Sequence, residues 1–323
     1  MIVAPWKRSS VAARKTARVP WAQPPKDRTG KNSMVQNDIG QRFHFEALGI
    51  RGEYVRLDQT WAALCALHPY PSAAAALLGE ALAAAALLSG TLKYPGTLTL
   101  QAAGDGALRA VMAEVRQTRA LRGIVRFRDD DAALPNIAAP LNHLGEGLLT
   151  LTLRPPKGEP HQGIVRLGGD HLAEAVERYF EQSEQLPTRL WLSTTHGVQG
   201  LLLQALPGGD CGAEGFERLA IMASTVKDQE LAELDAQTLL KRLFPEDDIR
   251  LHPPRPLAFE CTCSRERTQE TLAAMAPDTL EEILREDGEI LMTCQFCQAR
   301  YRFDPIDFAL LSQATKPEAS GPH

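Results

Sequence analysis

The sequence lacks an uninterrupted apolar run long enough to cross a membrane. Its longest apolar tract, residues 73–88, is rich in alanine and is interrupted by Gly79 and Glu80, so it predicts a buried helix of a folded core. The N-terminal residues contain no long apolar segment either, which argues against a secretory signal. We therefore expect a cytoplasmic protein without a membrane partner.

Motifs of enzymes and nucleotide-binding proteins are missing as well. The sequence has no phosphate-binding loop of the P-loop type, no Rossmann fingerprint and no nucleophile elbow, and the glycines of 104–106 predict a plain hairpin turn. The eight histidines are scattered, and no two of them have the spacing of a ligand pair. We therefore expect a protein that is not an enzyme and has no catalytic residue.

An excess of positive charge is also missing. The chain has 35 Lys and Arg against 40 Asp and Glu residues, which gives a formal net charge of −5. The stretch 259–303 contains nine acidic and five basic side chains. This stretch would repel a phosphate backbone, so nucleic acid is not expected as a partner.

Cysteine is scarce, and four of the six cysteines lie near the C-terminus. Cys261 and Cys263 form a C-x-C pair, Cys294 and Cys297 form a C-x-x-C pair, and 30 residues separate the pairs. Four thiolates that converge from two turns can bind zinc tetrahedrally, so we predict one Zn²⁺ per chain in the reduced protein. From spacing alone, a purely structural zinc is favoured over a redox-active one.

The other two cysteines are isolated. Cys65 lies in an apolar stretch and is expected to fill space in the core, whereas Cys211 has no partner by sequence and its role stays open. Permanent disulfides are disfavoured in a chain without an export signal. The cysteine pattern thus indicates a reducing compartment and a metal.

The cysteine motifs resemble those of a known family. CTCSRER at 261–267, EDGEI at 286–290 and CQFC at 294–297 resemble the redox-switch domain of the heat shock protein 33 family, which are bacterial holdase chaperones activated by oxidation. The resemblance runs from about Asp38 to about Ala309. Segments that resemble the core domain of that family are 92–96, 104–106 and 183–190.

The resemblance implies an ATP-independent holdase that is inactive while it is reduced and zinc-bound. Peroxide or hypochlorous acid would oxidise the four cysteines to the disulfides Cys261–Cys263 and Cys294–Cys297, release zinc and unfold the switch. The oxidised form, a homodimer, would bind unfolding client proteins during oxidative stress, and thiol reductants would reverse the change. The alternative is a zinc-ribbon module that binds nucleic acid or protein and has a purely structural zinc.

The hydrophobic pattern predicts an α/β (α+β) core with mixed sheets and a buried helix rich in alanine and leucine, a helical linker and a small C-terminal four-cysteine zinc domain. The expected segments are a basic disordered extension at 1–37, the core at 38–207, the linker at 208–258, the zinc domain at 259–310 and a disordered tail at 311–323. For the extension, the alternative to disorder is a transit peptide. If the extension is disordered, Met34 is the expected working start.

Alternation and end signals predict the individual elements. The expected strands are 41–47, 52–57, 97–102, 107–114, 121–127, 148–153, 163–167, 191–193, 200–206 and 298–303. The expected helices are 58–67 capped by Asp58, one that is capped by Ser72 and ends before Gly90, 171–182 capped by Asp170, and one that follows Pro277 with a capping box of Asp278 and Glu281 and ends at Gly288.

Apolar residues at helical spacing run through the linker. Amphipathicity alone favours an ordinary helical segment that packs on a core. Beside a redox site, the same segment can be a latch that detaches and exposes a client-binding surface, covered at rest by the core or by the zinc domain. The residues expected on this surface are Phe216, Leu219, Val226, Leu231, Leu234, Leu240 and Phe244.

Overall fold

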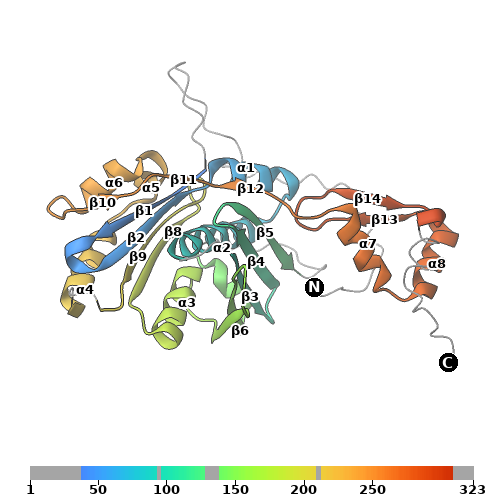
Figure 1. Cartoon of the computed structure of the whole chain (residues 1–323), viewed down its shortest axis with the longest axis horizontal. Coiled ribbons are helices and arrows are strands. Elements are labelled where there is room, and N and C mark those ends of the chain that lie inside the picture. Colours follow the sequence, from blue (N-terminus) through green and yellow to red (C-terminus); the bar gives the residue numbers. More distant parts are fainter. Residues whose placement is uncertain (1–37, 93–95, 128–137, 209–211, 308–323) are drawn as a thin grey trace, which may run out of the picture.

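The computed structural model of the chain describes residues 38–92, 96–127, 138–208 and 212–307 (Figure 1). The predictions for the N-terminal extension, the C-terminal tail and Cys211 fall outside the described residues. The strands are β1 (Ile39–Phe45), β2 (Ile50–Arg56), β3 (Thr97–Gly104), β4 (Leu108–Arg116), β5 (Ala120–Phe127), β6 (Gly147–Arg154), β7 (His161–Arg166), β8 (Thr188–Ser193), β9 (Gln199–Ala205), β10 (Arg250–Leu251), β11 (Arg255–Pro256), β12 (Ala258–Phe259), β13 (Ile290–Thr293) and β14 (Arg300–Phe303). The helices are α1 (Asp58–Leu67), α2 (Ser72–Thr91), α3 (Leu172–Tyr179), α4 (Gly212–Ala223), α5 (Asp228–Glu233), α6 (Ala236–Leu243), α7 (Arg265–Ala273) and α8 (Pro277–Asp287).

The described strands form three sheets. The first sheet has the order β10-β1-β2-β9-β8, and β11 also pairs with β1. The second sheet has the order β12-β5-β4-β3-β6-β7, and the third consists of β13 and β14. Helix α2 lies between the first two sheets and contacts both of them (Figure 1). The predicted α+β core with mixed sheets around an Ala/Leu-rich helix is therefore confirmed.

Helix α2 is apolar on every side, which explains its central position. All of its residues from Ala73 to Gly90 are buried. By length and composition α2 would also pass as a membrane span, but here the folded chain covers it completely. Small alanine side chains allow both sheets to approach the helix closely, and the larger leucines fill the space between the layers.

The first sheet is apolar on both faces. In β9, Leu202 belongs to the apolar cluster around α2, whereas Leu201 and Leu203 belong to a second cluster on the opposite face. This division follows from the two-residue period of a strand. The second cluster is completed by apolar residues of α4, α5 and α6, so the predicted linker covers the outer face of the first sheet. The division of the chain into domains remains a prediction.

The cap of α1 differs from the prediction. Asp58 is the first helical residue and does not cap the helix with its side chain. Instead, the buried carboxylate of Asp38 accepts hydrogen bonds from the backbone N–H groups of Gln59 (2.8 Å) and Thr60 (2.7 Å). A residue that is distant in sequence thus satisfies the first N–H groups of the helix, and no local pattern could indicate it.

Four other helix ends also correct the predictions. No side chain caps α2, which begins at Ser72 and continues through Gly90 to Thr91. Helix α3 is capped by His171, which forms a capping box with Glu174, and not by Asp170. Helix α8 begins directly at Pro277, so the predicted capping box is wrong. Its predicted end is confirmed, because Gly288 closes it in a left-handed conformation with φ 77°.

We predict that replacing Asp38 by Ala lowers the free energy of unfolding by about 1–2 kcal/mol, because the N–H groups of Gln59 and Thr60 lose their acceptor. Chemical denaturation measures this change. The Asp38→Asn variant keeps one acceptor oxygen and is expected to lose clearly less. Equal losses in the two variants would show that the carboxylate contributes through its charge and not as a cap.

Candidate metal centre

The four clustered cysteines meet at one point. Their Sγ atoms all lie within 4.8 Å of one another, with Cys261 3.7 Å from Cys294 and Cys263 3.3 Å from Cys297. A tetrahedral ion with Zn–S distances of about 2.3 Å needs sulfurs about 3.8 Å apart. The sulfur separations and the all-thiol donor set therefore fit zinc, and all four cysteines are free thiols here.

Two turns position the thiols. The first pair follows β12 and ends where Ser264 caps α7 by accepting a hydrogen bond from the Arg267 N–H. The second pair lies in the turn between β13 and β14, which is closed by hydrogen bonds from Cys294 N–H to Ala299 O (2.8 Å) and from Gln298 N–H to Cys294 O (2.9 Å). A short spacer within each pair forces both sulfurs toward the same side of the turn.

The thiols differ in acidity. Burial opposes ionisation of Cys263, but hydrogen bonds from Tyr301 and from the other cluster thiols outweigh burial and lower its pKa to about 7. The Tyr301 hydroxyl donates to this sulfur at 3.1 Å. Burial raises the pKa of Cys261 and of Cys297. Cys263 is therefore partly ionised near neutral pH, and the thiolate is the form that binds metals and reacts with oxidants.

The apolar core around the centre is small. Its buried members come from α7, α8, β13 and β14, and are Leu272, Leu280, Ile290 and Phe303. A cluster of this size stabilises a fold only weakly, because the apolar area removed from water is limited. A cross-link between its two cysteine pairs would therefore add much to the stability of the segment that follows β12.

The four arginines that flank the cysteine pairs in sequence do not carry hydrogen bonds to sulfur among the described contacts. Arg265 contacts Asp307 at 2.7 Å and stacks on Phe303, and Arg267 donates to Thr262 O at 3.0 Å. Arg300 and Arg302 are exposed at the edge of the third sheet. These arginines shape the surroundings of the centre without binding its ligands.

Sequence reasoning missed the arginine that contacts both cysteine pairs. Arg122, in β5, donates from Nη1 to Thr262 Oγ1 at 2.9 Å, and its guanidinium lies 4.4 Å from the ring centroid of Phe296. Thr262 is the spacer of the C-x-C pair and Phe296 lies within the C-x-x-C pair. A single side chain of the second sheet therefore holds both turns.

The charge of Arg122 is fixed by its neighbours. Burial disfavours the charge, but hydrogen bonds to Glu114 and to Cys261 outweigh burial and raise the pKa of Arg122. Its Nη2 lies 2.8 Å from Glu114 Oε1 on the adjacent strand. Strand pairing places these two residues opposite each other, which no motif in the sequence indicates. A permanent cation beside the thiols would offset the negative charge of a zinc tetrathiolate.

Two further contacts join the C-x-x-C turn to the core. Arg126 of β5 donates to Gln295 Oε1 at 2.6 Å, and the ring of His68, at the end of α1, lies 3.0 Å from Phe296 O through Nε2. Together with Arg122 they form a polar contact surface. The metal centre is thus attached to the edge of the second sheet, far from the linker helices (Figure 1).

The predicted linker surface lies elsewhere. All seven apolar residues belong to the cluster on the outer face of the first sheet. Five are buried, and Val226 and Leu234 are partly buried against them. Of the two covers considered for this surface, the core provides the cover in the described residues, because this cluster includes none from α7, α8, β13 or β14. Cys65 packs against the core around α2, and burial raises its pKa to about 11.

The fold and the four-thiol centre define an α+β protein. Helices α4–α6 cover one of its sheets, and a candidate metal site of four thiols follows these helices in the sequence. The sequence model of the Hsp33 protein family matches residues 38–304. The chain belongs to the Hsp33 family.

Relatives named 33 kDa chaperonin cover most of this chain. That of Nitrosococcus oceani is 43% identical over 293 residues, 90% of this chain and 100% of the relative. That of Azotobacter vinelandii is 44% identical over 286 residues, 86% of this chain and 95% of the relative. The crystal structure of the Thermotoga maritima 33 kDa chaperonin matches with a TM-score of 0.75 at 23% identity, over 86% of this chain and 98% of that one, and shows the same fold.

We predict that the Arg122→Gln variant binds zinc about 10-fold more weakly, because both turns lose their common contact and the thiolates lose a neighbouring cation. Competition with a chelator measures the affinity. Arg109, an exposed residue of β4, provides the matched control as Arg109→Gln, which is expected to bind zinc like the unchanged chain. Unchanged affinity in Arg122→Gln would contradict the role given to Arg122.

Proposed function

We propose that this protein is an ATP-independent holdase chaperone that is regulated by oxidation. The observation that carries the proposal is the four-thiol cluster, which lies in the same chain as a helical segment that covers an apolar sheet. Membership in the Hsp33 family and the names of the relatives support it. The protein would act in a reducing compartment such as the cytoplasm and bind unfolding proteins there.

In the resting state, Cys261, Cys263, Cys294 and Cys297 would hold one Zn²⁺. The bound ion would supply folding free energy to a segment whose own apolar core is small. Tyr301 stabilises the Cys263 thiolate through its hydroxyl, and Arg122 holds both turns against the core. The helices α4, α5 and α6 keep the apolar outer face of the first sheet covered, so the resting protein would not bind clients.

Activation would begin with oxidation of the thiolates. Formation of each disulfide removes two electrons from a cysteine pair, and a peroxide molecule takes them up with two protons and becomes two water molecules. The family resemblance implies the pairs Cys261–Cys263 and Cys294–Cys297. Disulfide sulfurs bind zinc poorly, so the segment would lose both its metal and its support.

Loss of this support would release the linker and expose its apolar surface together with the sheet beneath it. The linker residues Phe216, Leu219, Val226, Leu231, Leu234, Leu240 and Phe244 would then contribute to client binding. The active form would be a homodimer, and thiol reductants would restore the resting state. No nucleotide takes part in this cycle.

We predict that peroxide-treated protein suppresses aggregation of a heat-unfolded client, measured by light scattering, whereas reduced protein does not.

Elemental analysis is expected to find one zinc per reduced chain and much less in the Cys294→Ser variant, because three thiolates leave the tetrahedral shell incomplete. If oxidation releases zinc but creates no holdase activity, the centre is purely structural and the alternative zinc-ribbon function is favoured.

We predict that Leu240→Asp makes the reduced protein active while zinc stays bound. Leu240 is 3% exposed, and a carboxylate buried there without a partner costs several kcal/mol. Hydrogen exchange is expected to show an exposed linker over an intact core. Ile221 of α4 is 62% exposed and gives the matched control, since Ile221→Asp is expected to change neither exchange nor activity. A released linker that binds no client would refute the latch.

A further inference from the structure

The segment between the linker helices α4–α6 and the metal centre runs from the first sheet to the second. We call residues 250–259 the strap; it contains β10, β11 and β12. β10 and β11 pair with β1 at the edge of the first sheet, and β12 pairs with β5 at the edge of the second. The strap is also the covalent connection between α6 and the first cysteine pair, so it links the two parts that the proposed function couples.

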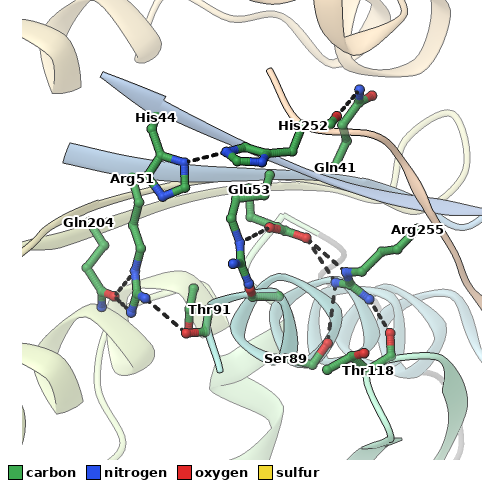
Figure 2. A network of polar contacts seen from close by, with 12 residues as sticks. Gln41, His44, Arg51, Glu53, Ser89, Thr91, Thr118, Gln204, His252 and Arg255 are labelled. Carbon is green, nitrogen blue, oxygen red and sulfur yellow. Dashed lines mark hydrogen bonds and ion pairs between the residues drawn. The ribbon is translucent and has the colours of Figure 1, made fainter. Parts of the chain in front are cut away.

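Apolar packing holds the strap only weakly. Leu257 is its one buried side chain, and the others are half-buried or exposed. A pocket of about 200 Å³ lies beside the strap, between Gly40, Arg42, Glu53 and His252. Polar contacts therefore carry much of the attachment, including the pair of His44 Nδ1 and His252 Nε2 at 2.9 Å (Figure 2).

Arg255 makes the central contacts of the strap (Figure 2). Its Nε and Nη2 lie 3.1 and 3.0 Å from Glu53 Oε1 in β2. Nη2 also donates to Ala86 O in α2 at 2.8 Å, and Nη1 donates to Thr118 O in the turn between β4 and β5. One guanidinium thus connects the first sheet, the central helix and the second sheet.

Glu53 depends on this partner. Its side chain is 1% exposed, and its Oε2 accepts no hydrogen bond from the described residues. Burial raises the pKa of Glu53, and the charge of Arg255 is the largest influence that opposes this rise. Arg42 is more distant, with its Nε 3.9 Å from Oε2. If Arg255 left, the carboxylate would remain buried with a much weaker counter-charge.

Arginines from three strands converge on the C-terminal end of α2, which has no basic residue of its own in the last turn. Arg42 of β1 donates to Gly90 O, Arg51 of β2 donates to Thr91 O at 2.9 Å, and Arg255 donates to Ala86 O. These cations satisfy carbonyl groups and the negative end of the helix dipole. Of the three, only Arg255 belongs to the strap.

We propose that the Arg255–Glu53 ion pair is the lock that keeps the strap, and through it the linker, on the core while the metal centre is reduced. The lock would regulate the proposed chaperone activity, so its biological role rests on the proposed function. Because the linker and the metal centre lie apart, the strap is the covalent route by which loss of the centre reaches the linker. The lock sets the threshold that this loss must overcome.

The experiment compares reduced, zinc-bound Arg255→Gln with the unchanged chain by hydrogen exchange. Breaking a buried pair on one side leaves an uncompensated charge, so exchange in residues 244–259 is expected to rise on the order of 100-fold while zinc stays bound. The variant is also expected to suppress client aggregation without oxidant. Arg250→Gln is the matched control, because Arg250 also belongs to the strap but forms an exposed ion pair with Glu46 outside it. This variant is expected to change neither hydrogen exchange nor client binding.

Two further variants separate the lock from general damage to the core. Glu53→Gln combined with Arg255→Gln removes both charges and is expected to recover a large part of the lost protection, which a purely steric role of Arg255 does not predict. Gly40→Ala keeps both charges but places a Cβ 2.7 Å from Arg255 Cζ, so it is expected to loosen the strap in the same direction but less.

The outcomes distinguish the two proposals. Unchanged strap exchange in Arg255→Gln and Gly40→Ala overturns the lock, whatever the chaperone assay gives. Global unfolding of Arg255→Gln that the double variant does not relieve also overturns it, because the residue then supports the core as a whole. A released strap in a protein that never binds clients, even after oxidation, supports the lock and refutes the proposed function.

Discussion

The complete burial of α2 is the constraint on which the other layers depend. A helix that is apolar on all sides needs cover all round, and two sheets provide it. One of these sheets is built from strands with apolar residues on both faces, so its outer face needs a second cover. The helices α4, α5 and α6 meet this need. The resting position of the linker is therefore a consequence of how the core is built.

Local patterns in the sequence predicted those parts of the fold that local physics decides. The nine core strands, the buried helix and the left-handed end of α8 at Gly288 follow from periodicity and from glycine, and the structure contains them all. Strands β10, β11 and β12 were missed because two residues show no alternation. The cap of α1 was wrongly assigned to Asp58, because the acceptor, Asp38, lies outside this helix and far from it in sequence.

The candidate metal centre also combines features that local sequence predicts with features that depend on distant residues. Cysteine spacing was enough to predict that four thiols converge, since each pair needs only one turn. Arg122 could not be found in this way, because its position depends on the pairing of β5 with β4 and on the attachment of the C-terminal segment to the sheet edge. Nor could the sequence reveal that the linker and the centre occupy separate surfaces of one core.

The strap has one more consequence, which concerns the backbone. It forms the outermost strand of both large sheets, beside β1 in one and beside β5 in the other. Its departure would turn each of these strands into an open edge with unpaired N–H and C=O groups, the arrangement that favours pairing with an extended segment of another chain. A single short segment therefore covers one edge of each of the two large sheets against intermolecular β-pairing.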